Sequence, residues 1–234
     1  MFHKSARFYD LIYGFKDYEK ESAQIHALIQ QHKRSEGNTL LDVACGTGAH
    51  IAFLNQQYVI EGLDLDDEML NIARERFPNL TFHLADMCDF DLGRQFDIVT
   101  CLFSSIGYVG TVPRLNQAVA CMEQHLLPGG VLILEPWIKP EFFTPGGVHA
   151  RFVDEPDLKI ARMNDSEVEG SLSILNFHYL VSTPEGVQYF TERHELGLFT
   201  HEQYLDAFSA AKLTVIHDWP GLMNRGLYIG LKGD

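Results

Sequence analysis

The sequence lacks any apolar run of about 18 residues, the length of a membrane-spanning helix, and its first residues, MFHKSARFYD, lack the apolar core of a signal peptide. We therefore expect neither membrane insertion nor secretion, and we expect a cytoplasmic protein. The four cysteines show no CxxC spacing, so neither a disulfide framework nor a zinc site is indicated. We expect reduced, mostly buried thiols.

Basic residues are also scarce. The chain has 18 Lys plus Arg against 32 Asp plus Glu, which gives a formal charge of −14. A field of this sign repels phosphate backbones, so nucleic acid is disfavoured as a partner.

The length and apolar content suffice for one globular domain with a full core, since 46% of the 234 residues are hydrophobic. Residues 18–33 and 113–127 show helical periodicity. In the second stretch one face carries Leu115, Val119, Met122 and Leu126. Short apolar runs predict strands at 39–43, 58–63, 80–84, 96–102 and 131–135. Helices fit between most of these strands, so residues 35–136 are typical of a doubly wound, Rossmann-like α/β fold with a parallel sheet.

The pattern changes after Pro136. Residues 150–196 alternate apolar and polar side chains, which predicts an antiparallel β insertion of three or four strands after the fifth strand. A helix at about 200–211 and two final strands then complete a sheet of seven strands, the last one antiparallel. We expect three parts: 1–137 with the N-terminal helices and the cofactor-binding core, 138–198 with the insertion, and 199–234 with the rest of the sheet.

The stretch LLDVACGTGAH, residues 40–50, predicts a buried strand followed by a tight turn at Gly46 and Gly48. In an open α/β sheet the ligand crevice lies at this end of the strands. A dinucleotide fingerprint needs a third glycine where Ile51 stands, and the P-loop pattern is absent, so NAD, FAD and nucleoside triphosphates are disfavoured. Asp42 is placed to interact with a cationic or amine-bearing group.

Two acids follow at the ends of the next strands. Asp64 ends the second strand, where a carboxylate can accept hydrogen bonds from both ribose hydroxyls; the alternative is an acid that caps the following helix. Asp86 and Met87 follow the third strand, where an acid can accept from an exocyclic amine and a thioether can pack on an adenine face.

These stretches resemble the motifs of the class I S-adenosylmethionine-dependent methyltransferases. LLDVACGTGAH, GLDLDDEML, LADMCDF, FDIVTCLFSSIGYV and LPGGVLILEPW follow that family's order across about residues 38–137. The resemblance implies that S-adenosyl-L-methionine is the cofactor, with the methionine portion over Ala44, Gly46 and Gly48, the ribose on Asp64, and the adenine on Asp86 and Met87. It also implies cofactor contacts from Tyr9, Tyr18, Asp42, Met69, Leu102 and Phe103. One departure is Ala44, where many members have a third glycine.

The turn after the fourth strand narrows the possible classes of methyl acceptor. It reads LFSSIGY, without the Asn/Asp-Pro-Pro-Tyr pattern of DNA and protein amide methylases. No carboxylate occurs between Thr100 and Leu115, so we expect no metal of the kind that catechol methylases use.

The likeness extends beyond the core. YDLIYGFKDY, FSSIGYV, EPW and NRGLYIG are similar to the N,N-dimethyltransferases that finish nucleotide-linked amino-deoxysugars in macrolide pathways. That resemblance implies a catalytic region at Tyr13 and Tyr108, a diphosphate contact at Arg225, and a homodimer built through the insertion. The substrate-binding residues it implies are Tyr13, Tyr108, Trp137, His178 and Arg225.

Alternatives stay open for several of these residues. Tyr9 and Tyr13, four residues apart, could be a packed helical pair, and Arg225 could be a surface cation. His178 and His194 lie on insertion strands, where a lone histidine is more often structural. If the acceptor is an amine near its own pKa, proximity suffices without a general base.

The predicted function is therefore methyl transfer to a small molecule, with N-methylation of an amino-sugar-like amine as the leading hypothesis. The alternatives are O- or carboxyl methylation of another natural product and a non-catalytic S-adenosylmethionine-binding module. A nicotinamide oxidoreductase is the weakest alternative because of Ile51.

Overall fold

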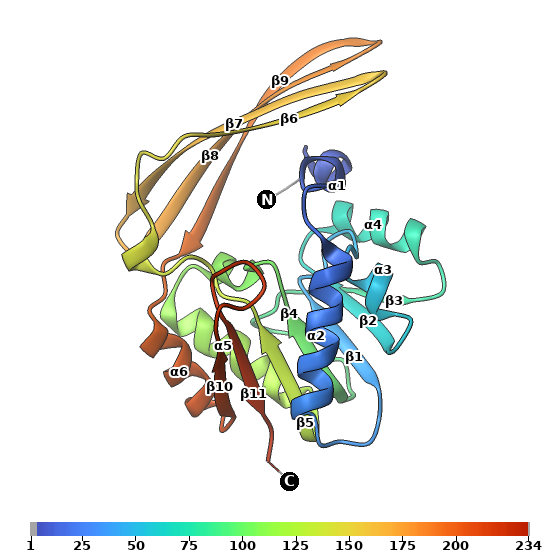
Figure 1. The fold of residues 1–234 in the computed structure, drawn as a ribbon, viewed down its shortest axis with the longest axis vertical. Helices are drawn as coiled ribbons and strands as arrows, with labels where there is room; N and C mark the ends of the chain where they lie inside the picture. The colour runs from blue at the N-terminus through green and yellow to red at the C-terminus, as the bar shows by residue number, and fades with distance from the viewer. Residues whose placement is uncertain (1–3, 234) are drawn as a thin grey trace.

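The computed structural model describes residues 4–233, which form two separate β-sheets (Figure 1). The larger sheet has seven strands in the order β10-β11-β5-β4-β1-β2-β3. Its strands are β1 (Thr39–Val43), β2 (Val59–Asp64), β3 (Thr81–Leu84), β4 (Phe96–Cys101), β5 (Leu126–Leu134), β10 (Thr214–Asp218) and β11 (Leu227–Leu231). Neighbours pair in parallel except β11, which runs antiparallel to both β5 and β10. The doubly wound sheet with one antiparallel strand is thereby confirmed.

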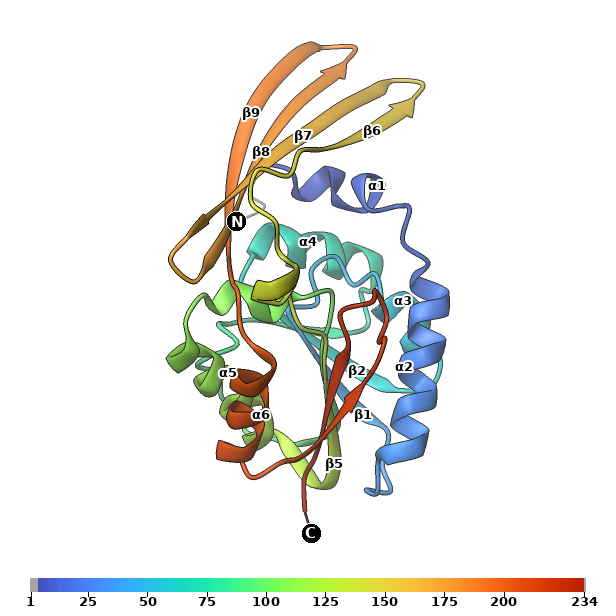
Figure 2. The same cartoon turned by 60° about the vertical axis from the view of Figure 1, so that its left-hand side comes forward.

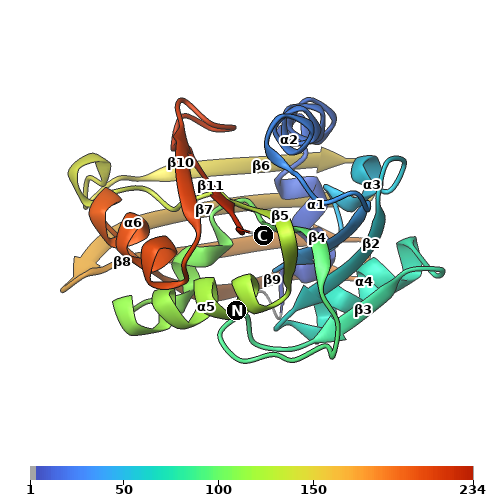
Figure 3. The ribbon, with the colours of Figure 1, turned by 90° about the horizontal axis from the view of Figure 1, so that it is seen from below.

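Helices cover both faces of this sheet (Figure 3). On one face, α2 (Tyr18–His32) and α3 (Ile51–Leu54) bury side chains such as Ile25 and Ile29 against β1 and β2. On the other, α5 (Val112–Gln124) packs against β5, and α6 (His201–Ala210) packs against α5 and β10. A further helix, α4 (Asp67–Arg76), follows β2 and packs between β2 and β3. No helix within residues 4–233 is long and apolar enough to cross a membrane.

One predicted helix boundary is wrong. We expected Leu126 on the apolar face of a helix reaching residue 127, but α5 ends at Gln124 and Leu126 opens strand β5. Leu126 pairs with Phe96 at the start of β4, and both side chains are fully buried. An apolar residue just past a helix fits the hydrophobic pattern of a strand as well as that of a helix, so periodicity alone could not place it.

The second sheet is an antiparallel meander, in the order β6-β7-β8-β9. Its strands are β6 (His149–Glu155), β7 (Leu158–Glu169), β8 (Leu172–Thr183) and β9 (Gly186–Gly197). The meander extends above the carboxyl ends of the larger sheet's parallel strands, and the N-terminal helix α1 (Tyr9–Ile12) lies beneath it (Figures 1 and 2). Short 3₁₀ turns complete the described fold: η1 (Ala6–Phe8), η2 (Ser105–Val109) and η3 (Pro140–Phe142).

The inner face of the meander has its own apolar cluster. Phe8 and Ile12 of the N-terminal segment pack there against Ile160, Phe177 and Tyr179 of β7 and β8. The N-terminal segment is therefore held between the two sheets, directly above the strand ends where a ligand crevice is expected.

The start of β1 depends on one buried carboxylate from β4. Asp97 is 2% exposed and accepts hydrogen bonds from the Gly37 N–H, the Thr39 N–H and the Thr39 hydroxyl. Burial alone raises the pKa of Asp97, but the hydrogen bonds from Thr39 and the charge of Lys33 outweigh it and hold the pKa below its usual range.

We expect Asp97→Asn to lower the free energy of unfolding by about 1–3 kcal/mol at neutral pH, because charge-assisted hydrogen bonds are lost. A lowered folded pKa stabilises the protein above the unfolded pKa of about 3.9, and this contribution is lost as pH falls through the folded value. Denaturant titrations from pH 7 to about pH 2 should show a difference from wild type that is constant down to about pH 4 and shrinks below it. The exposed Asp157→Asn is the control, and a difference independent of pH contradicts the assignment.

Candidate active site

A cavity of about 690 Å³, counting the space at its mouth, opens at the carboxyl ends of β1, β2 and β3. This is the usual size and place of a small-ligand site in an open α/β sheet. Among the predicted site residues, the lining contains Tyr9, Ala44, Gly46, Asp64, Met69, Asp86, Met87 and Tyr108. Sequence reasoning missed Leu63, Leu65, Asp66, Ala85, Ser105, Val109 and Arg114, which also line the cavity.

The glycine turn leaves its backbone open to the cavity. Gly46 has φ +55°, and no atom beyond its chain neighbours would lie within 4 Å of an added Cβ. Gly48 has φ +76°, and there a Cβ would lie 2.9 Å from the Phe77 ring, so close helix packing requires glycine. Ala44 also has a positive φ of 58°, a conformation that glycine adopts more readily than alanine.

Asp64 connects this turn to the next strand. One carboxylate oxygen accepts from the Gly46 N–H at 2.8 Å and the other from the Asp66 N–H at 2.9 Å. The Leu65 N–H also stabilises the charged form, and because a carboxylate has about four acceptor sites, acceptor capacity remains for a ligand hydroxyl. The N-terminus of α4 is capped by Asp66, whose side chain accepts from the Glu68 and Met69 N–H groups. Asp64 is therefore free for a pair of vicinal hydroxyls such as those of a ribose.

Asp86 has a basic neighbour that the sequence did not indicate. Its Oδ1 accepts from the Cys88 N–H at 2.9 Å, and its Oδ2 accepts from Arg114 Nη2 at 2.8 Å. Burial raises the pKa of Asp86, but the hydrogen bonds from Cys88 and Arg114 dominate and lower it overall. The carboxylate is thus charged at neutral pH and suited to accept from an exocyclic amine, with Met87 beside it.

The N-terminal tyrosines are both a packed pair and part of the site. The Tyr9 and Tyr13 rings lie 4.6 Å apart, and Tyr9 also lines the cavity. The Tyr13 hydroxyl accepts from Arg162 Nη1 at 3.0 Å, which ties α1 to the meander.

Asp10 holds the same helix onto the glycine turn. Its Oδ1 accepts from the Thr47 hydroxyl at 2.6 Å, and its Oδ2 accepts from Arg76 Nη1 at 2.9 Å. The N-terminal segment therefore covers the cavity from above and is attached to the core below it.

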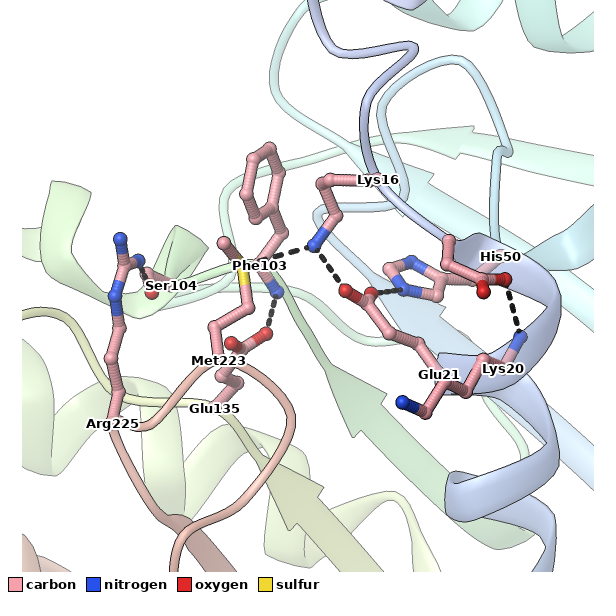
Figure 4. A network of polar contacts seen from close by, with 10 residues as sticks. Lys16, Lys20, Glu21, His50, Phe103, Ser104, Glu135, Met223 and Arg225 are labelled. Atoms are coloured by element: carbon pink, nitrogen blue, oxygen red, sulfur yellow. Dashed lines mark hydrogen bonds and ion pairs between the residues drawn. The ribbon is translucent and has the colours of Figure 1, made fainter.

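Several predicted cofactor residues lie behind the cavity wall. Figure 4 shows a buried network in which Glu21 accepts from Lys16 Nζ at 2.7 Å and contacts His50 Nε2 at 2.9 Å. The Tyr18 ring packs edge-on against His50. Asp42 accepts from the Thr100 hydroxyl at 2.8 Å, and burial raises its pKa to about 6.

The structure does not bring these groups into the lining itself. The predicted cofactor residues that lie outside the lining are Tyr18, Asp42, Gly48, Leu102 and Phe103, and the predicted substrate residues that lie outside it are Tyr13, Trp137, His178 and Arg225.

The turn after β4 adjoins the far end of the cavity. Phe103 and Ser104 both have positive φ, 51° and 62°. The Phe103 N–H donates to Glu135 Oε2 at 2.6 Å, and Arg225 Nη1 donates to the Ser104 hydroxyl at 2.7 Å (Figure 4). The Arg225 guanidinium also lies 4.7 Å from the centroid of the Trp137 ring. Arg225 is thus built into this wall.

Two histidines of the insertion differ in where the structure places them. His178 is exposed on the outer face of the meander, bonded to the Tyr189 hydroxyl at 2.6 Å, so the structure does not bring it to the cavity. His194 lies on the inner face, where its Nδ1 is 2.7 Å from the hydroxyl of Tyr108. His194 is the insertion histidine next to the site, and strand alternation was the signal that could have separated the two.

Comparisons with known proteins agree with this geometry. A methyltransferase domain family model matches residues 40–130. The Streptomyces fradiae dTDP-3-amino-3,6-dideoxy-alpha-D-glucopyranose N,N-dimethyltransferase is 44% identical over 97% of this chain and 91% of its own length. The chain belongs to the S-adenosylmethionine-dependent sugar N,N-dimethyltransferases.

Solved structures of this methyltransferase family share the whole fold. The crystal structure of Streptomyces venezuelae DesVI matches with a TM-score of 0.92 and 40% identity, over 98% of this chain and 99% of that one. CalS10, an amino pentose methyltransferase from Micromonospora echinaspora solved with S-adenosylmethionine bound, matches with a TM-score of 0.87 and 38% identity over 96% of each chain. The cofactor of this methyltransferase is S-adenosylmethionine, and the acceptor sites left on Asp64, the charged Asp86 and the open side of Gly46 fit its ribose, adenine and methionine parts. Within residues 4–233, no group of three His, Cys, Asp or Glu side chains is arranged to hold a metal ion.

We expect Asp64→Ala to weaken S-adenosylmethionine binding at least about tenfold, because hydrogen bonds to an ionised acceptor contribute about 1.5–3 kcal/mol each. Asp64→Asn, which keeps one acceptor oxygen for the Gly46 N–H, should lie between Ala and wild type. Isothermal titration calorimetry measures both. The exposed Asp67→Ala, three residues along, is the control, and unchanged affinity in Asp64→Ala contradicts the ribose assignment.

Proposed function

We propose that this enzyme methylates the amino group of a nucleotide-linked amino-deoxysugar. The observation that carries the proposal is the 44% identity, over nearly the whole chain, to a relative that acts on dTDP-3-amino-3,6-dideoxy-alpha-D-glucopyranose. A second hollow of the structure supports the proposed acceptor. This hollow is lined by Ile138, Lys139, Phe142, Trp219, Met223, Asn224 and Arg225.

The chemistry of that hollow suits a nucleoside diphosphate handle. Arg225 and Lys139 supply positive charge for a diphosphate, in a chain that otherwise carries a formal charge of −14. Phe142 and Trp219 are 66% and 58% exposed, which leaves two aromatic faces available to stack on a base. A sugar between this hollow and Tyr108 would present its amine to the cofactor cavity.

Methyl transfer depends mainly on the alignment of the donor methyl group with the acceptor amine. S-adenosylmethionine supplies an activated methyl group with a neutral thioether as leaving group. The protein holds the donor through Asp64 and Asp86, and the acceptor amine has to approach in line with its lone pair free. Tyr13 and Tyr108 are the side chains that we propose to border this approach, with Trp137 and Arg225 on the acceptor side.

We expect wild type to add one and then two methyl groups to dTDP-3-amino-3,6-dideoxyglucose, detected by mass spectrometry. The panel should include a dTDP-4-amino sugar, the free amino sugar, and phenol and carboxylate acceptors. A reactive phenol or acid beside unreactive amines overturns N-methylation in favour of the O- or carboxyl alternative. Cofactor binding without turnover on any acceptor indicates a non-catalytic module.

Arg225→Met should raise KM for the dTDP-amino sugar about tenfold or more, because the diphosphate loses a cationic partner. The affinity for S-adenosylmethionine should not change. Arg94→Met, an exposed arginine paired with Glu61 away from both hollows, is the control. An unchanged KM in Arg225→Met contradicts the diphosphate assignment.

We also propose that residues 138–198 serve the substrate and a homodimer, and that the enzyme works in the cytoplasm. The four cysteines are free thiols, which suits a reducing compartment. The outer face of the meander supports the dimer, because Phe152, Leu180 and Tyr189 are 50–69% exposed and lie in one row across the strands. Two acidic copies repel one another generally, so a row of uncharged, apolar side chains is a suitable contact.

We expect Leu180→Lys to shift the enzyme from dimer to monomer in sedimentation velocity experiments at micromolar concentration, because it buries a charge in the row. Val59→Lys, at an equally exposed apolar residue on β2, should leave the dimer intact. A monomeric wild type contradicts the proposal, as does a dimer unaffected by Leu180→Lys.

A further inference from the structure

A continuous set of polar side chains leads from the cavity wall into the interior of the meander. The Tyr108 hydroxyl lines the cavity end of this set and lies 2.7 Å from His194 Nδ1. On the other side of the ring, His194 Nε2 lies 3.6 Å from Glu192 Oε2. The side chains of His194 and Glu192 are 0% and 7% exposed, so water does not compete for these contacts.

Neighbouring side chains hold His194 between Tyr108 and Glu192. The Phe177 ring packs edge-on against the imidazole, with centroids 4.9 Å apart. Glu192 also accepts from the Ser5 hydroxyl at 2.7 Å and from the N–H groups of Lys4 and Ser5. The imidazole is therefore held with one nitrogen toward the phenol and the other toward a carboxylate, the arrangement by which buried histidines accept and stabilise a proton.

The proposed amine acceptor requires a group that takes up its proton. An alkylamine resembles the lysine side chain, whose pKa is about 10.4, so at neutral pH the amine is mostly an ammonium without a free lone pair. Each methyl transfer to nitrogen therefore requires the loss of one proton, and a second methylation requires another.

Tyr108 alone is unsuited to act as the base, because its charged phenolate form is disfavoured in this site. Burial raises the pKa of the Tyr108 phenol, and Tyr13, Tyr179, Glu192 and Asp64 raise it further. A neutral phenol can still pass a proton, because its oxygen accepts one hydrogen while its own hydrogen moves to a partner. The Arg162 guanidinium lies 4.8 Å from the centroid of the Phe177 ring, which packs against His194.

We propose that Tyr108, His194 and Glu192 form a proton relay that deprotonates the acceptor ammonium before each methyl transfer. This inference rests on the proposed amine acceptor. One N–H bond of the ammonium breaks and its proton moves to the Tyr108 oxygen, while the Tyr108 hydroxyl proton moves to His194 Nδ1. The imidazolium faces the Glu192 carboxylate. The freed lone pair forms the N–C bond, the C–S bond breaks, and its electron pair stays on sulfur. After the methylated product leaves, the proton returns through the Tyr108 hydroxyl to solvent in the open cavity, which resets the relay.

The test compares pH profiles of kcat in Tyr108→Phe and His194→Gln with wild type, on the dTDP-amino sugar from pH 6 to about 10. We expect kcat at pH 7 to fall about 10²-fold or more, the usual contribution of a positioned acid–base group. The loss should shrink as pH rises toward the pKa of the amine, because the acceptor then loses its proton to solvent. Glu192→Gln, which keeps an acceptor for the Ser5 hydroxyl, should show a smaller loss with the same pH dependence.

His83→Gln is the matched control, since His83 also pairs with a glutamate, Glu61, at 2.7 Å but lies outside the cavity lining. Calorimetric binding of S-adenosylmethionine to every variant shows that the fold is retained. A loss of kcat that is equal at all pH values indicates a merely structural role and overturns the relay, as does an unchanged kcat. A wild type that methylates no amine of the panel overturns both the relay and the proposed function.

Discussion

The hydrogen bonds of the Asp64 carboxylate are the contacts on which the cofactor side of the structure depends. By accepting from Gly46 on one side and Asp66 on the other, this side chain joins the turn after β1 to the start of α4. The two backbone segments that would surround a ribose are thereby fixed relative to each other. Burial raises the pKa of Asp64, so these donors also offset the cost of keeping a charge in the wall of a cavity. A carboxylate with both oxygens already anchored loses little freedom when a ligand binds.

The acceptor side depends on a different set of ties, all of which involve the N-terminal segment. Asp10 joins it to the glycine turn, Arg162 joins it through Tyr13 to the meander, and Glu192 holds its first described residues. The segment is therefore positioned by both sheets at once. Its attachment lets Tyr9 serve as cavity wall while Tyr13 belongs to the contact with the insertion. A single segment thus sets the distance between the donor site and the meander.

Much of this could be predicted from the sequence, because the signals were local. The strands of the core, the glycine turn and the acids at strand ends follow from hydrophobic runs and from residues whose chemistry has one use at that place. Arg114 could not be predicted, since a helix-start arginine carries no pattern, and only the fold brings it to Asp86. Asp42 and Tyr18 were expected beside the ligand but lie outside the lining of the cavity, because a motif fixes the sequence position of a residue and not the direction of its side chain.

The insertion shows what a closer use of alternation could have given. In β8 the odd-numbered Phe177, Tyr179 and Val181 are buried, whereas His178 and Leu180 face outward. His194 of β9 shares its face with the buried Phe190 and Leu196. The period of two therefore separates the inner from the outer histidine, although it could not reveal that Tyr108 is the inner one's partner. That contact joins residues 86 positions apart and exists only once the meander folds over η2.

The turn after β4 is where these two halves meet, and its backbone is strained. Phe103 and Ser104 both adopt a left-handed conformation that costs non-glycine residues about 1 kcal/mol or more each. Glu135 accepts from the Phe103 N–H, and the Ser104 hydroxyl donates to the Pro136 carbonyl at 2.7 Å, so the residues that follow β5 hold the strained turn in place. Because η2 begins at the next residue, this conformation sets the direction in which Tyr108 leaves the core. The strain is thus located at a turn that adjoins the cofactor cavity through Ser105 and the second hollow through the contact of Ser104 with Arg225.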